Sequence, residues 1–336
     1  MCAVRIMTAC SAQKEAGAIL AVQDSPDPVL TDDGVLVTVA AAGVNPADLL
    51  QVAGAYPPPP GAPSWPGLEV AGLIVATGPL VRGWAVGERV AALLSGGGYA
   101  ELAAVSASQL LPVPDTLSDV AAAALPEGLA TSWSNLVDVG GMQPDDVVLV
   151  HGATGGVGSL AAQLAVARGA KVVAVAGGTE RAQRLRELLA AVPGAHEPIV
   201  VDRTTEDFVA ACKGLGGADV VLDVVGAANL GRNVEALGTG GRLVVIGLQR
   251  GRKGELDLGT LLAKRASVHG TTLRARPLDE KAAIVSAVRE EVWPLVVDGT
   301  ITPVVHATFP LEDAQQAHET VRSGSPFGKV VLVRHG

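Results

Sequence analysis

The chain is poor in cysteine, in aromatic residues and in positive charge, and each shortage argues against a class of protein. Its three cysteines, Cys2, Cys10 and Cys212, are too few and too scattered for a disulfide framework or a cysteine-rich metal site. Aromatic residues make up 3% of the sequence, and 25 Lys and Arg are outnumbered by 34 Asp and Glu, which leaves a net charge of −9. This charge favours neither a nucleic acid nor an anionic membrane as a partner.

The sequence also lacks the patterns of secretion and of membrane insertion. Residues 1–14 have neither the basic start nor the apolar core of a signal peptide, and no apolar stretch reaches membrane-spanning length without a charge or a glycine. We therefore expect a cytoplasmic protein with no membrane insertion. What the chain does have is size and apolar character: 336 residues, 49% of them hydrophobic, predict two domains with sizeable cores.

Two regions of the sequence differ in their pattern. Up to about residue 125, short apolar stretches separated by Gly and Pro predict strands at 4–8, 34–41, 68–76 and 89–94, which is typical of a β-rich, partly barrel-like domain. From residue 126 onward, predicted strands alternate with predicted helices, which indicates an α/β fold with a parallel, doubly wound sheet. A long helix is predicted over 278–296. The tail follows with a strand at 304–309, a helix at 311–322 and a strand at 329–333.

The most informative stretch is the small-residue turn that follows the apolar run 147–150. It fits the pattern A-x-G-x-x-G, with Ala153, Gly155 and Gly158 at the three small positions, and an apolar-periodic stretch follows to Gly169. Small residues at this spacing allow a tight turn, a close approach of a diphosphate to the backbone, and packing of the helix on the sheet. An ordinary glycine-rich turn is the alternative. The second strand predicted at 171–176 completes a β-α-β unit and favours dinucleotide binding.

Several motifs together resemble a known superfamily. They are GVNPAD at 43–48, PGLEVAG at 66–72, HGATGGVG at 151–158 and FGKVV at 327–331. The chain resembles the medium-chain dehydrogenase/reductase superfamily, and within it the zinc-free quinone oxidoreductases related to zeta-crystallin. Residues 51–61 and 270–276 look most like the tumour-suppressor-inducible branch. The resemblance implies a GroES-like catalytic domain from 1–124 and 267–336, a Rossmann NADPH-binding domain from 125–266, and a homodimer or homotetramer.

The resemblance also implies that no metal is bound. The zinc-dependent alcohol dehydrogenases of the superfamily carry Cys where this chain has Asn45 and His where it has Leu68. Leucine cannot ligate zinc, and an amide is a poor substitute for a thiolate. The hydroxyl that relays the alcohol proton in those enzymes falls on Ala47. The two histidines His151 and His269 have no ligand partners at metal spacing and are interpreted as packing or loop residues.

Cofactor choice depends on the end of the second Rossmann strand. An NAD enzyme places Asp or Glu there to bind the ribose 2′-hydroxyl, whereas residues 176–179 are AGGT, with no carboxylate at the tip. Arg181 falls where relatives carry a phosphate-binding Lys, and a guanidinium suits phosphate geometry. The alternative is that Arg181 lies on a solvated helix face. Glu180 and Asp202, the latter where relatives usually have Tyr, argue against NADPH, but NADPH remains the favoured cofactor.

Other cofactor contacts follow from position in the resemblance. Asn45 matches a residue near the nicotinamide ribose, Thr131 one beside the nicotinamide amide, and Lys329 one at the phosphates. Without the family context, Asn45 and Thr131 are equally well explained as turn or cap residues. The predicted cofactor-binding set is Asn45, Thr131, Ala153, Thr154, Gly155, Gly156, Val157, Gly178, Arg181, Gly247, Leu248, Leu273, Arg274 and Lys329.

The implied reaction is hydride transfer from nicotinamide C4 to a quinone, with the protein supplying orientation and electrostatics. The predicted catalytic residues are Tyr56, as the wall of the acceptor site with a hydroxyl that could donate to the quinone oxygen, Asn45, and Asp48 near it. Alternatively, the Tyr56 ring stacks on the prolines at 57–60. Reduction of an activated C=C bond in an enone, acrylate or acyl-thioester remains open. A non-catalytic crystallin-like or RNA-binding role is disfavoured by the intact fingerprint and the negative charge.

Overall fold

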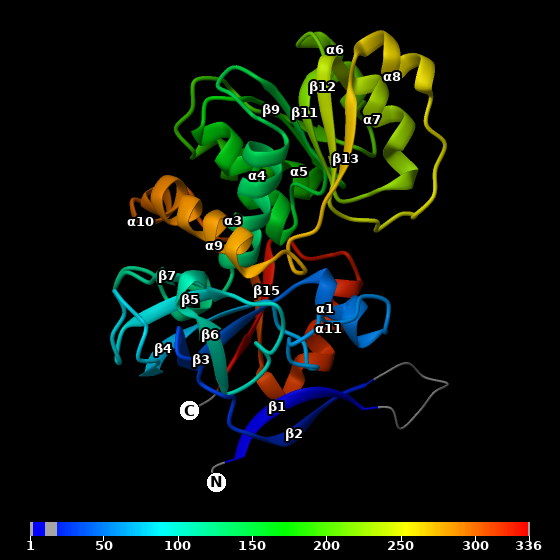
Figure 1. Cartoon of the computed structure of the whole chain (residues 1–336). Coiled ribbons are helices and arrows are strands. Elements are labelled where there is room, and N and C mark those ends of the chain that lie inside the picture. The colour runs from blue at the N-terminus through cyan, green and yellow to red at the C-terminus, as the bar shows by residue number, and fades with distance from the viewer. Residues whose placement is uncertain (1–2, 11–18, 335–336) are drawn as a thin grey trace. The chain divides into compact units, whose positions relative to one another are not determined.

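We describe a computed structural model of the chain, which defines residues 3–10 and 19–334 (Figure 1). The chain forms two compact units. Unit 1 contains Met1–Ala130, Leu273–Val297 and Pro303–Gly336, and unit 2 contains Thr131–Thr272 and Asp298–Thr302. The predicted α/β fold class, a β-rich domain with a doubly wound parallel sheet, is confirmed.

Unit 1 is built on a seven-stranded sheet with the order β14-β15-β3-β4-β5-β7, in which β6 also pairs with β3. All of these pairs are antiparallel except β14 with β15, and a separate antiparallel hairpin is formed by β1 and β2. The strands are β1 (Ala3–Cys10), β2 (Ile19–Pro26), β3 (Gly34–Val44), β4 (Glu69–Thr77), β5 (Arg89–Leu93), β6 (Leu102–Ser106), β7 (Leu110–Pro112), β14 (Val305–Pro310) and β15 (Lys329–Val333). The helices are α1 (Pro46–Val52), a 3-10 turn (Ala107–Gln109), α2 (Asp119–Ala122), α3 (Pro126–Trp133, which continues into unit 2), α9 (Leu278–Ala287), a π-helix (Val288–Val292), α10 (Trp293–Val297), a 3-10 turn (Leu311–Asp313) and α11 (Ala314–Arg322).

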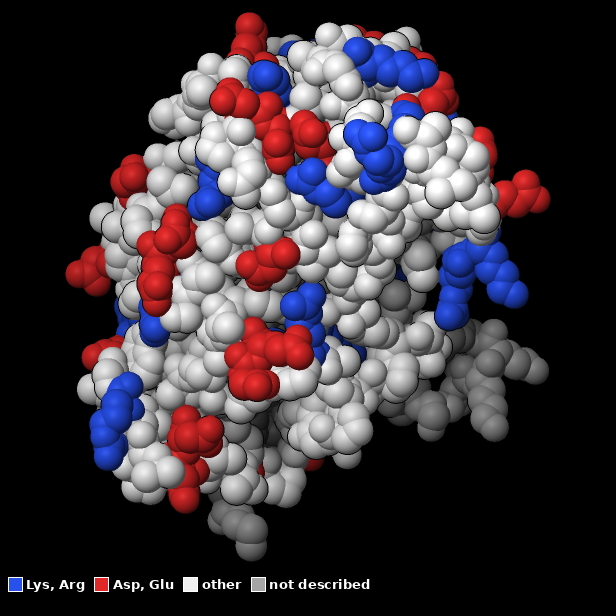
Figure 2. Space-filling model, turned by 45° about the horizontal axis from the view of Figure 1, so that its top comes forward, with Lys and Arg blue, Asp and Glu red and all other residues white. Residues whose placement is uncertain are grey.

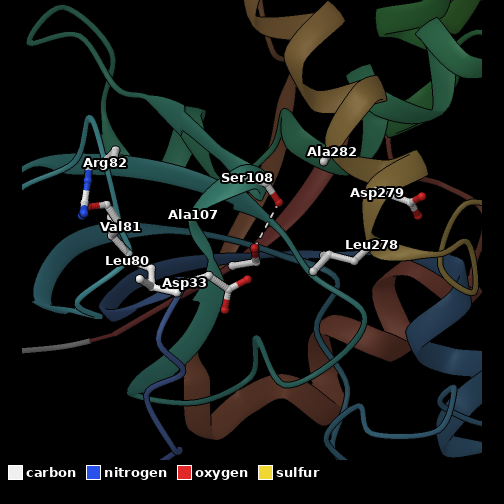
Figure 3. Close-up of a pocket in the computed structure, with 10 residues that line it drawn as sticks. Asp33, Leu80, Val81, Arg82, Ala107, Ser108, Leu278, Asp279 and Ala282 are labelled. Atoms are coloured by element: carbon white, nitrogen blue, oxygen red, sulfur yellow. Dashed lines mark hydrogen bonds between the residues drawn. The ribbon is translucent and has the colours of Figure 1, made fainter.

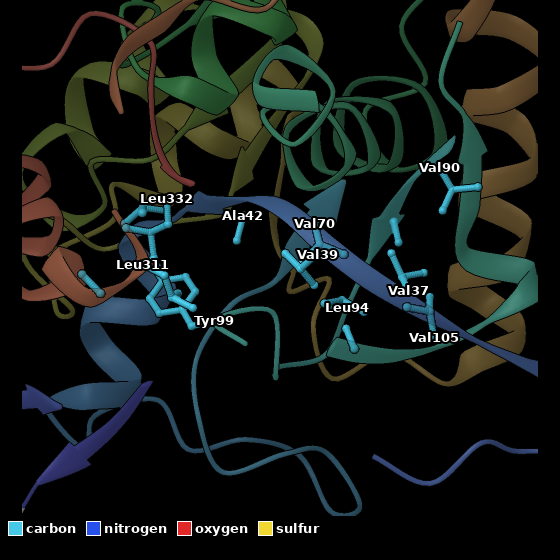
Figure 4. Packing of buried hydrophobic residues seen from close by; sticks show 14 of the residues in the cluster. Val37, Val39, Ala42, Val70, Val90, Leu94, Tyr99, Val105, Leu311 and Leu332 are labelled. Atoms are coloured by element: carbon cyan, nitrogen blue, oxygen red, sulfur yellow. The ribbon is translucent and has the colours of Figure 1, made fainter. Parts of the chain in front are cut away.

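The core of unit 1 lies where the long strand β3 meets β4, β15 and α11. Val37 and Val39 of β3 are almost completely buried, and Figure 4 shows them in one cluster with Tyr99, Leu311 and Leu332. Alternating apolar positions along a strand place such side chains on the same face of the sheet. The ends of β3, β4 and β15 are therefore fixed by a common core, and these ends carry several of the predicted site residues.

Unit 2 contains a six-stranded parallel sheet with the order β10-β9-β8-β11-β12-β13. Its strands are β8 (Val147–Val150), β9 (Lys171–Ala176), β10 (Ile199–Asp202), β11 (Ala218–Asp223), β12 (Leu237–Val245) and β13 (Ser267–Gly270). Its helices are a π-helix (Ser134–Val139), α4 (Gly156–Ala167), α5 (Thr179–Ala190), α6 (Phe208–Gly214), a 3-10 turn (Ala227–Asn229), α7 (Leu230–Ala236) and α8 (Leu258–Lys264). Right-handed crossovers place α4 and α5 on one face and α6 and α7 on the other, because the strand order reverses after β10. All four residues of β8 are buried, as expected for a strand covered on both faces.

A short, distant stretch completes unit 2. The side chain of Gln163 on α4 is fully buried, and its amide bonds the backbone of Thr302 twice. Gln163 Nε2 donates to Thr302 O at 3.0 Å, and Thr302 N donates to Gln163 Oε1 at 2.9 Å. The side-chain amide of Gln163 thus both donates to and accepts from the backbone of Thr302, and it attaches the stretch Asp298–Thr302 to α4.

The long helix predicted over 278–296 is present as one continuous helical span, but its middle turn is a π-helix, which the sequence did not predict. The helix α9 ends at Ala287, a π-helix follows, and α10 begins at Trp293, whose N–H bonds Val288 O five residues back. Pro294 has no N–H, and its ring would meet the carbonyl of the residue four positions earlier, so a wider hydrogen-bond register accommodates it. The apolar period alone does not reveal this shift.

The surface carries both signs of charge. On the face shown in Figure 2, Lys and Arg side chains are interspersed with Asp and Glu among uncharged residues, and they do not merge into a continuous basic surface there. Within the part of the chain that the structure describes, no helix is long and apolar enough to cross a membrane.

Candidate active site

Asn45, Glu69 and Lys329 form a buried triangle at the ends of three neighbouring elements of unit 1. Asn45 precedes α1, Glu69 begins β4 and Lys329 begins β15, and β3 lies between these two strands. Asn45 Nδ2 donates to Glu69 Oε1 at 2.8 Å, and Lys329 Nζ donates to Asn45 Oδ1 at 2.7 Å and to Glu69 Oε1 at 2.6 Å. The Lys329 ammonium is thus bonded within unit 1, which differs from the predicted phosphate contact, and that contact stays a prediction.

Asp48 lies beside this triangle, as predicted, and supports the Asn45 backbone. Its Oδ2 accepts from Asn45 N at 2.8 Å, and its Oδ1 accepts from Gly67 N at 2.9 Å. The Tyr99 hydroxyl donates to Asp48 Oδ2 at 3.2 Å and lies 3.1 Å from His318 Nε2. Burial raises the pKa of Asp48 to about 6, against the opposing effect of the two backbone donors.

A third carboxyl group, that of Glu127, was not identified from the sequence. Its backbone N donates to Glu69 Oε2 at 2.9 Å, so both oxygens of Glu69 are bonded. Burial, and then the charge of Glu69, raise the pKa of Glu127 to about 8. At neutral pH the Glu127 carboxyl is therefore mostly protonated. Its signal in the sequence was the acidic residue after Pro126, a position that more often marks a helix start than a site.

Tyr56 is the predicted wall of the acceptor site, and the structure places a guanidinium over its ring. Arg274 Cζ lies 5.4 Å from the ring centroid, and Arg274 Nη1 donates to Tyr56 O at 3.3 Å. Arg274 Nη2 donates to Gln51 Oε1 at 2.6 Å. Burial raises the pKa of the half-buried Tyr56 hydroxyl. Leu273 and Arg274, predicted to line the nicotinamide, are grouped with unit 1.

In unit 2, the start of α4 offers backbone donors where the fingerprint predicts them. The first i→i−4 bond of the helix runs from Ser159 N to Gly155 O, at 2.9 Å. The N–H groups of Gly156, Val157 and Gly158 precede that bond, and the N-cap Gly155 has no side chain to occupy them. Three adjacent donors at a positive helix end fit a phosphate group.

Two other fingerprint residues are fixed by the turn that leads into this helix. Ala153 is fully buried and its N–H bonds Val175 O on β9, and Thr154 is also buried. A Cβ at Gly158 would lie 2.1 Å from Gly152 O, so only glycine allows the helix to start so close to the turn. The residues of this turn therefore fit the diphosphate cradle that the sequence predicts.

The end of β9 itself carries no carboxylate, but the neighbouring strand supplies one. Asp202, which already argues against NADPH in the sequence, lies at the end of β10 and accepts a bond from Gly178 N at 2.9 Å. Asp202 also accepts from Thr204 N at 3.0 Å and from the hydroxyls of Thr204 and Thr179 at 2.7 and 3.2 Å. These bonds, those from Thr204 above all, lower the pKa of Asp202 to about 2. The Gly178 N–H, predicted to contact the cofactor, is thus already bonded.

Arginines gather around the same tip. The Arg203 guanidinium lies over Gly177, where an added Cβ would be 2.9 Å from its Nη2. Burial, and then the charges of Arg203 and Arg184, lower the pKa of Arg181. Arg203 was missed because it follows a different strand and has no place in the family motif.

The remaining predicted cofactor residues of unit 2 lie in α3 and in the loop after β12. Thr131 is buried in α3, and its carbonyl accepts from Asn135 Nδ2 at 2.7 Å. Gly247 follows β12, with its N–H directed to Asp223 O at 3.3 Å, and Leu248 is half exposed. These contacts are compatible with a ligand beside either segment, and the cofactor roles stay predictions.

The two histidines discussed above have ordinary hydrogen-bond partners. His151 is buried with its Nε2 2.7 Å from Asn233 Oδ1, and burial lowers its pKa to about 4. His269 Nε2 lies 2.8 Å from Ser267 Oγ. Among the described residues, no three His, Cys, Asp or Glu side chains are grouped in a way that could hold a metal ion.

A surface hollow in unit 1 lies apart from these groups. It has a volume of about 560 Å³ and is lined by Asp33, Leu80, Val81, Arg82, Ser106, Ala107, Ser108, Leu278, Asp279 and Ala282. Figure 3 shows these side chains around the bond between Ser106 and Ser108. None of the predicted site residues lines this hollow, so it plays no part in the site described above.

Comparison with known proteins assigns the chain to a family. Residues 31–115 match the model of the alcohol dehydrogenase GroES-like domain, and residues 193–332 match that of a zinc-binding dehydrogenase domain. The quinone oxidoreductase of Mus musculus is 33% identical over 318 residues, which is 91% of each chain. The chain belongs to the quinone oxidoreductase family of the medium-chain dehydrogenase/reductase superfamily.

Further matches bear on the range of this family. A solved quinone oxidoreductase of Pseudomonas syringae superposes with a TM-score of 0.84 at 27% identity, over 99% of this chain and all of that one. The polyketide synthase GfsB of Streptomyces halstedii is 32% identical over 303 residues, which is 90% of this chain but 5% of that much longer protein.

As a member of the quinone oxidoreductase family, this chain is an oxidoreductase with a nicotinamide cofactor-binding domain. The GroES-like assignment of its first domain is confirmed. One of the matched domain models is named for zinc binding. At the two positions where zinc-dependent relatives carry Cys and His ligands, this chain has Asn45 and the buried Leu68, and Asn45 is bonded to Glu69 and Lys329. The resemblance to the tumour-suppressor-inducible branch stays a prediction.

Proposed function

We propose that this oxidoreductase is an NADPH-dependent, zinc-independent quinone reductase, acting as a homodimer or homotetramer. The observation that carries the proposal is the Asn45–Glu69–Lys329 triangle. At the positions where zinc-dependent relatives hold a metal, this chain has the amide of Asn45 and the buried Leu68. The neighbouring carboxylate, that of Glu69, accepts a hydrogen bond from the Lys329 ammonium. A quinone carbonyl is electron-poor enough to accept hydride without a metal, so a site of this kind suits it.

The arginine cluster supports NADPH over NADH. Arg181, Arg184 and Arg203 gather at the end of β9, where the adenosine ribose lies in dinucleotide-binding folds. Guanidinium groups bind phosphate oxygens in a fork, and two of them outweigh one carboxylate whose lone pairs are already bonded. Asp202 is such a carboxylate, because Gly178, Thr179 and Thr204 all donate to it.

When bound, NADPH would supply the hydride from nicotinamide C4. The chain's own residues bind and orient it: the backbone donors of Gly156, Val157 and Gly158 would hold the diphosphate, and the Arg181–Arg203 pair the 2′-phosphate. On the acceptor side, the Tyr56 ring and the Arg274 guanidinium above it would form a wall against water. Asn45 is held in one orientation by Glu69 and Lys329, which suits a residue that positions the nicotinamide ribose.

A second candidate is reduction of an activated C=C bond. The likeness to the solved CurK enoyl reductase, with a TM-score of 0.81 at 25% identity over 99% of this chain, favours it, and such a reaction also needs only a bound hydride and an electrophile. The two candidates differ in the acceptor alone.

The test is turnover by the purified protein. We expect NADPH to be oxidised much faster than NADH when an ortho- or para-quinone is added, with no effect of a chelator. Arg203→Ala and Arg181→Ala should each narrow the preference for NADPH about tenfold or more, since each removes a charge-assisted bond. Arg186→Ala is the matched control, because Arg186 lies on the same helix and bonds Val200 O. Turnover with enones but with no quinone would contradict the first candidate in favour of the second.

A further inference from the structure

Lys281, which has no role in the site described so far, lies buried in unit 1 beside the Arg274 guanidinium. Lys281 on α9 and Arg274 are about 5% and 3% exposed, and both bond Ser95. Lys281 Nζ donates to Ser95 Oγ, and Arg274 Nε donates to Ser95 O at 2.8 Å. One serine at the end of β5 therefore brings together an ammonium and a guanidinium from a segment about 180 residues away in sequence.

Neither cation is neutralised by an acid. Within the described residues, no carboxylate oxygen lies within 4 Å of either side chain, and their partners are all neutral: Ser95, Gln51 Oε1 and Tyr56 O. Two carboxyl groups act over a longer distance: Glu127 on both cations, and Asp48 on Arg274. Burial raises the pKa of Glu127 to about 8, which weakens its effect at neutral pH. The direct partners of the two buried cations are therefore neutral groups.

Buried charge of this kind is costly unless it is paired. Taking an ammonium or a guanidinium out of water costs several kcal/mol, and hydrogen bonds to neutral groups return only part of it. An ammonium also has three donors, of which Ser95 uses one. Such a cluster is suited to receive an anion, and its network runs through Arg274 to Tyr56, the predicted wall of the acceptor site.

We infer that Lys281 and Arg274, held together by Ser95, form an oxyanion-binding site for the acceptor. This inference rests on the proposed function. When hydride is delivered to one carbonyl oxygen of a quinone, the electron pair moves through the ring to the other carbonyl oxygen and makes a phenolate; with an enone, hydride adds to the β-carbon and the carbonyl becomes an enolate. The Lys281 ammonium binds this oxygen and gives it a proton, which completes the hydroquinone. The resulting amine takes a proton back from water. Ser95 is a positioning residue, because its carbonyl and hydroxyl orient the two cations.

The site can be tested without turnover by a phenol whose colour reports its ionisation, 4-nitrophenol. Added to the protein with and without NADP⁺, it should bind as the phenolate, with its pKa lowered by about one unit or more, because an opposite charge at contact favours the ionised form. Lys281→Met should abolish that shift, and Lys281→Arg should retain most of it. Ser95→Ala, which leaves both cations in place, should reduce the shift partly. Lys213→Met is the control, since Lys213 is exposed and paired with Glu235.

The outcomes separate this inference from the proposed function. If 4-nitrophenol does not bind, or binds with an unchanged pKa, the oxyanion site is wrong even where quinone turnover is fast. If the shift is present and depends on Lys281 but no quinone or enone is reduced, the site stands and the proposed function fails. A merely structural Lys281 would change the thermal midpoint in Lys281→Met and leave the phenolate shift as in the wild type.

Discussion

Lys329 Nζ lies 2.6 Å from Glu69 Oε1, and the two side chains are 3% and 0% exposed. Removing one partner of such a pair leaves an uncompensated buried charge, which costs about 3–5 kcal/mol. We expect Glu69→Gln to lower the free energy of unfolding by that amount in urea titrations, and the double variant Glu69→Gln, Lys329→Met to recover most of it. The exposed pair of Glu235 with Lys213 gives the control, because Glu235→Gln should cost about 1 kcal/mol or less. Equal losses in both single variants would contradict the buried-charge account.

The fingerprint glycines allow folding and cofactor binding to be separated. A Cβ at Gly158 would lie 2.1 Å from Gly152 O, whereas a Cβ at Gly155 meets the same atom at 3.4 Å, an ordinary contact. Gly155 also has φ −87°, which any residue adopts. We expect Gly158→Ala to lower the thermal midpoint by several degrees, and Gly155→Ala to fold normally but to weaken NADPH binding at least tenfold in calorimetry. Normal binding by Gly155→Ala would remove the diphosphate from this turn.

The buried imidazole of His151 should make unit 2 sensitive to acid. Its pKa is about 4 in the folded protein and near 6.5 when unfolded, so its contribution to stability is complete above pH 6.5 and is lost as the pH falls towards 4. The loss amounts to up to about 3 kcal/mol. We expect His151→Gln to lose less stability than the wild type between pH 7 and pH 4 in urea titrations at several pH values. The control is His306→Gln at an exposed position, which should lose as much stability as the wild type between pH 7 and pH 4. If His151→Gln loses as much as the wild type too, the His151 imidazole does not cause the loss.

Tyr56 could act through its ring, as a wall of the acceptor site, or through its hydroxyl, as a donor to the quinone oxygen. Removing the hydroxyl alone or the whole ring distinguishes these two roles. The structure places the Arg274 guanidinium over the ring, and burial raises the pKa of the hydroxyl, which makes it a weaker proton donor. We therefore expect Tyr56→Phe to keep kcat within about threefold, and Tyr56→Leu to raise the quinone KM about fivefold to tenfold, in line with about 1 kcal/mol for a cation–π contact. A large loss of kcat in Tyr56→Phe would instead assign the hydroxyl to proton transfer.

Much of the fold could be predicted because its strands have a strong local pattern. The bounds predicted for β9 and β15 agree with the structure, since each is a compact apolar run next to a clear break in the sequence. The π-helical turn after Ala287 could not be predicted from the apolar period, because the helix continues through it and only the hydrogen-bond register changes.

The site was less predictable where it depends on neighbours that are distant in sequence. The turn from Ala153 to Gly158 is local, and its geometry follows from the spacing of small residues. The bond from Gly178 N to Asp202 joins residues 24 positions apart, beyond the end of β9 and at the end of β10, and that of Lys329 to Asn45 spans 284 positions. Local sequence patterns do not bring these pairs together. Only the order of the strands in the two sheets shows that Asp202 bonds Gly178 and that Lys329 bonds Asn45 within unit 1.

The bonds of Gln163 to Thr302 bear on how the protein is made. Thr302 lies 139 residues after Gln163, so at about 5–20 residues per second the ribosome delivers it roughly 7 to 28 s later. During that interval α4 lacks the stretch Asp298–Thr302, and the side-chain amide of Gln163, which is buried in the folded protein, is exposed to water or to other chains. A nascent chain that pauses before residue 298 should therefore hold unit 2 without its last stretch, Asp298–Thr302.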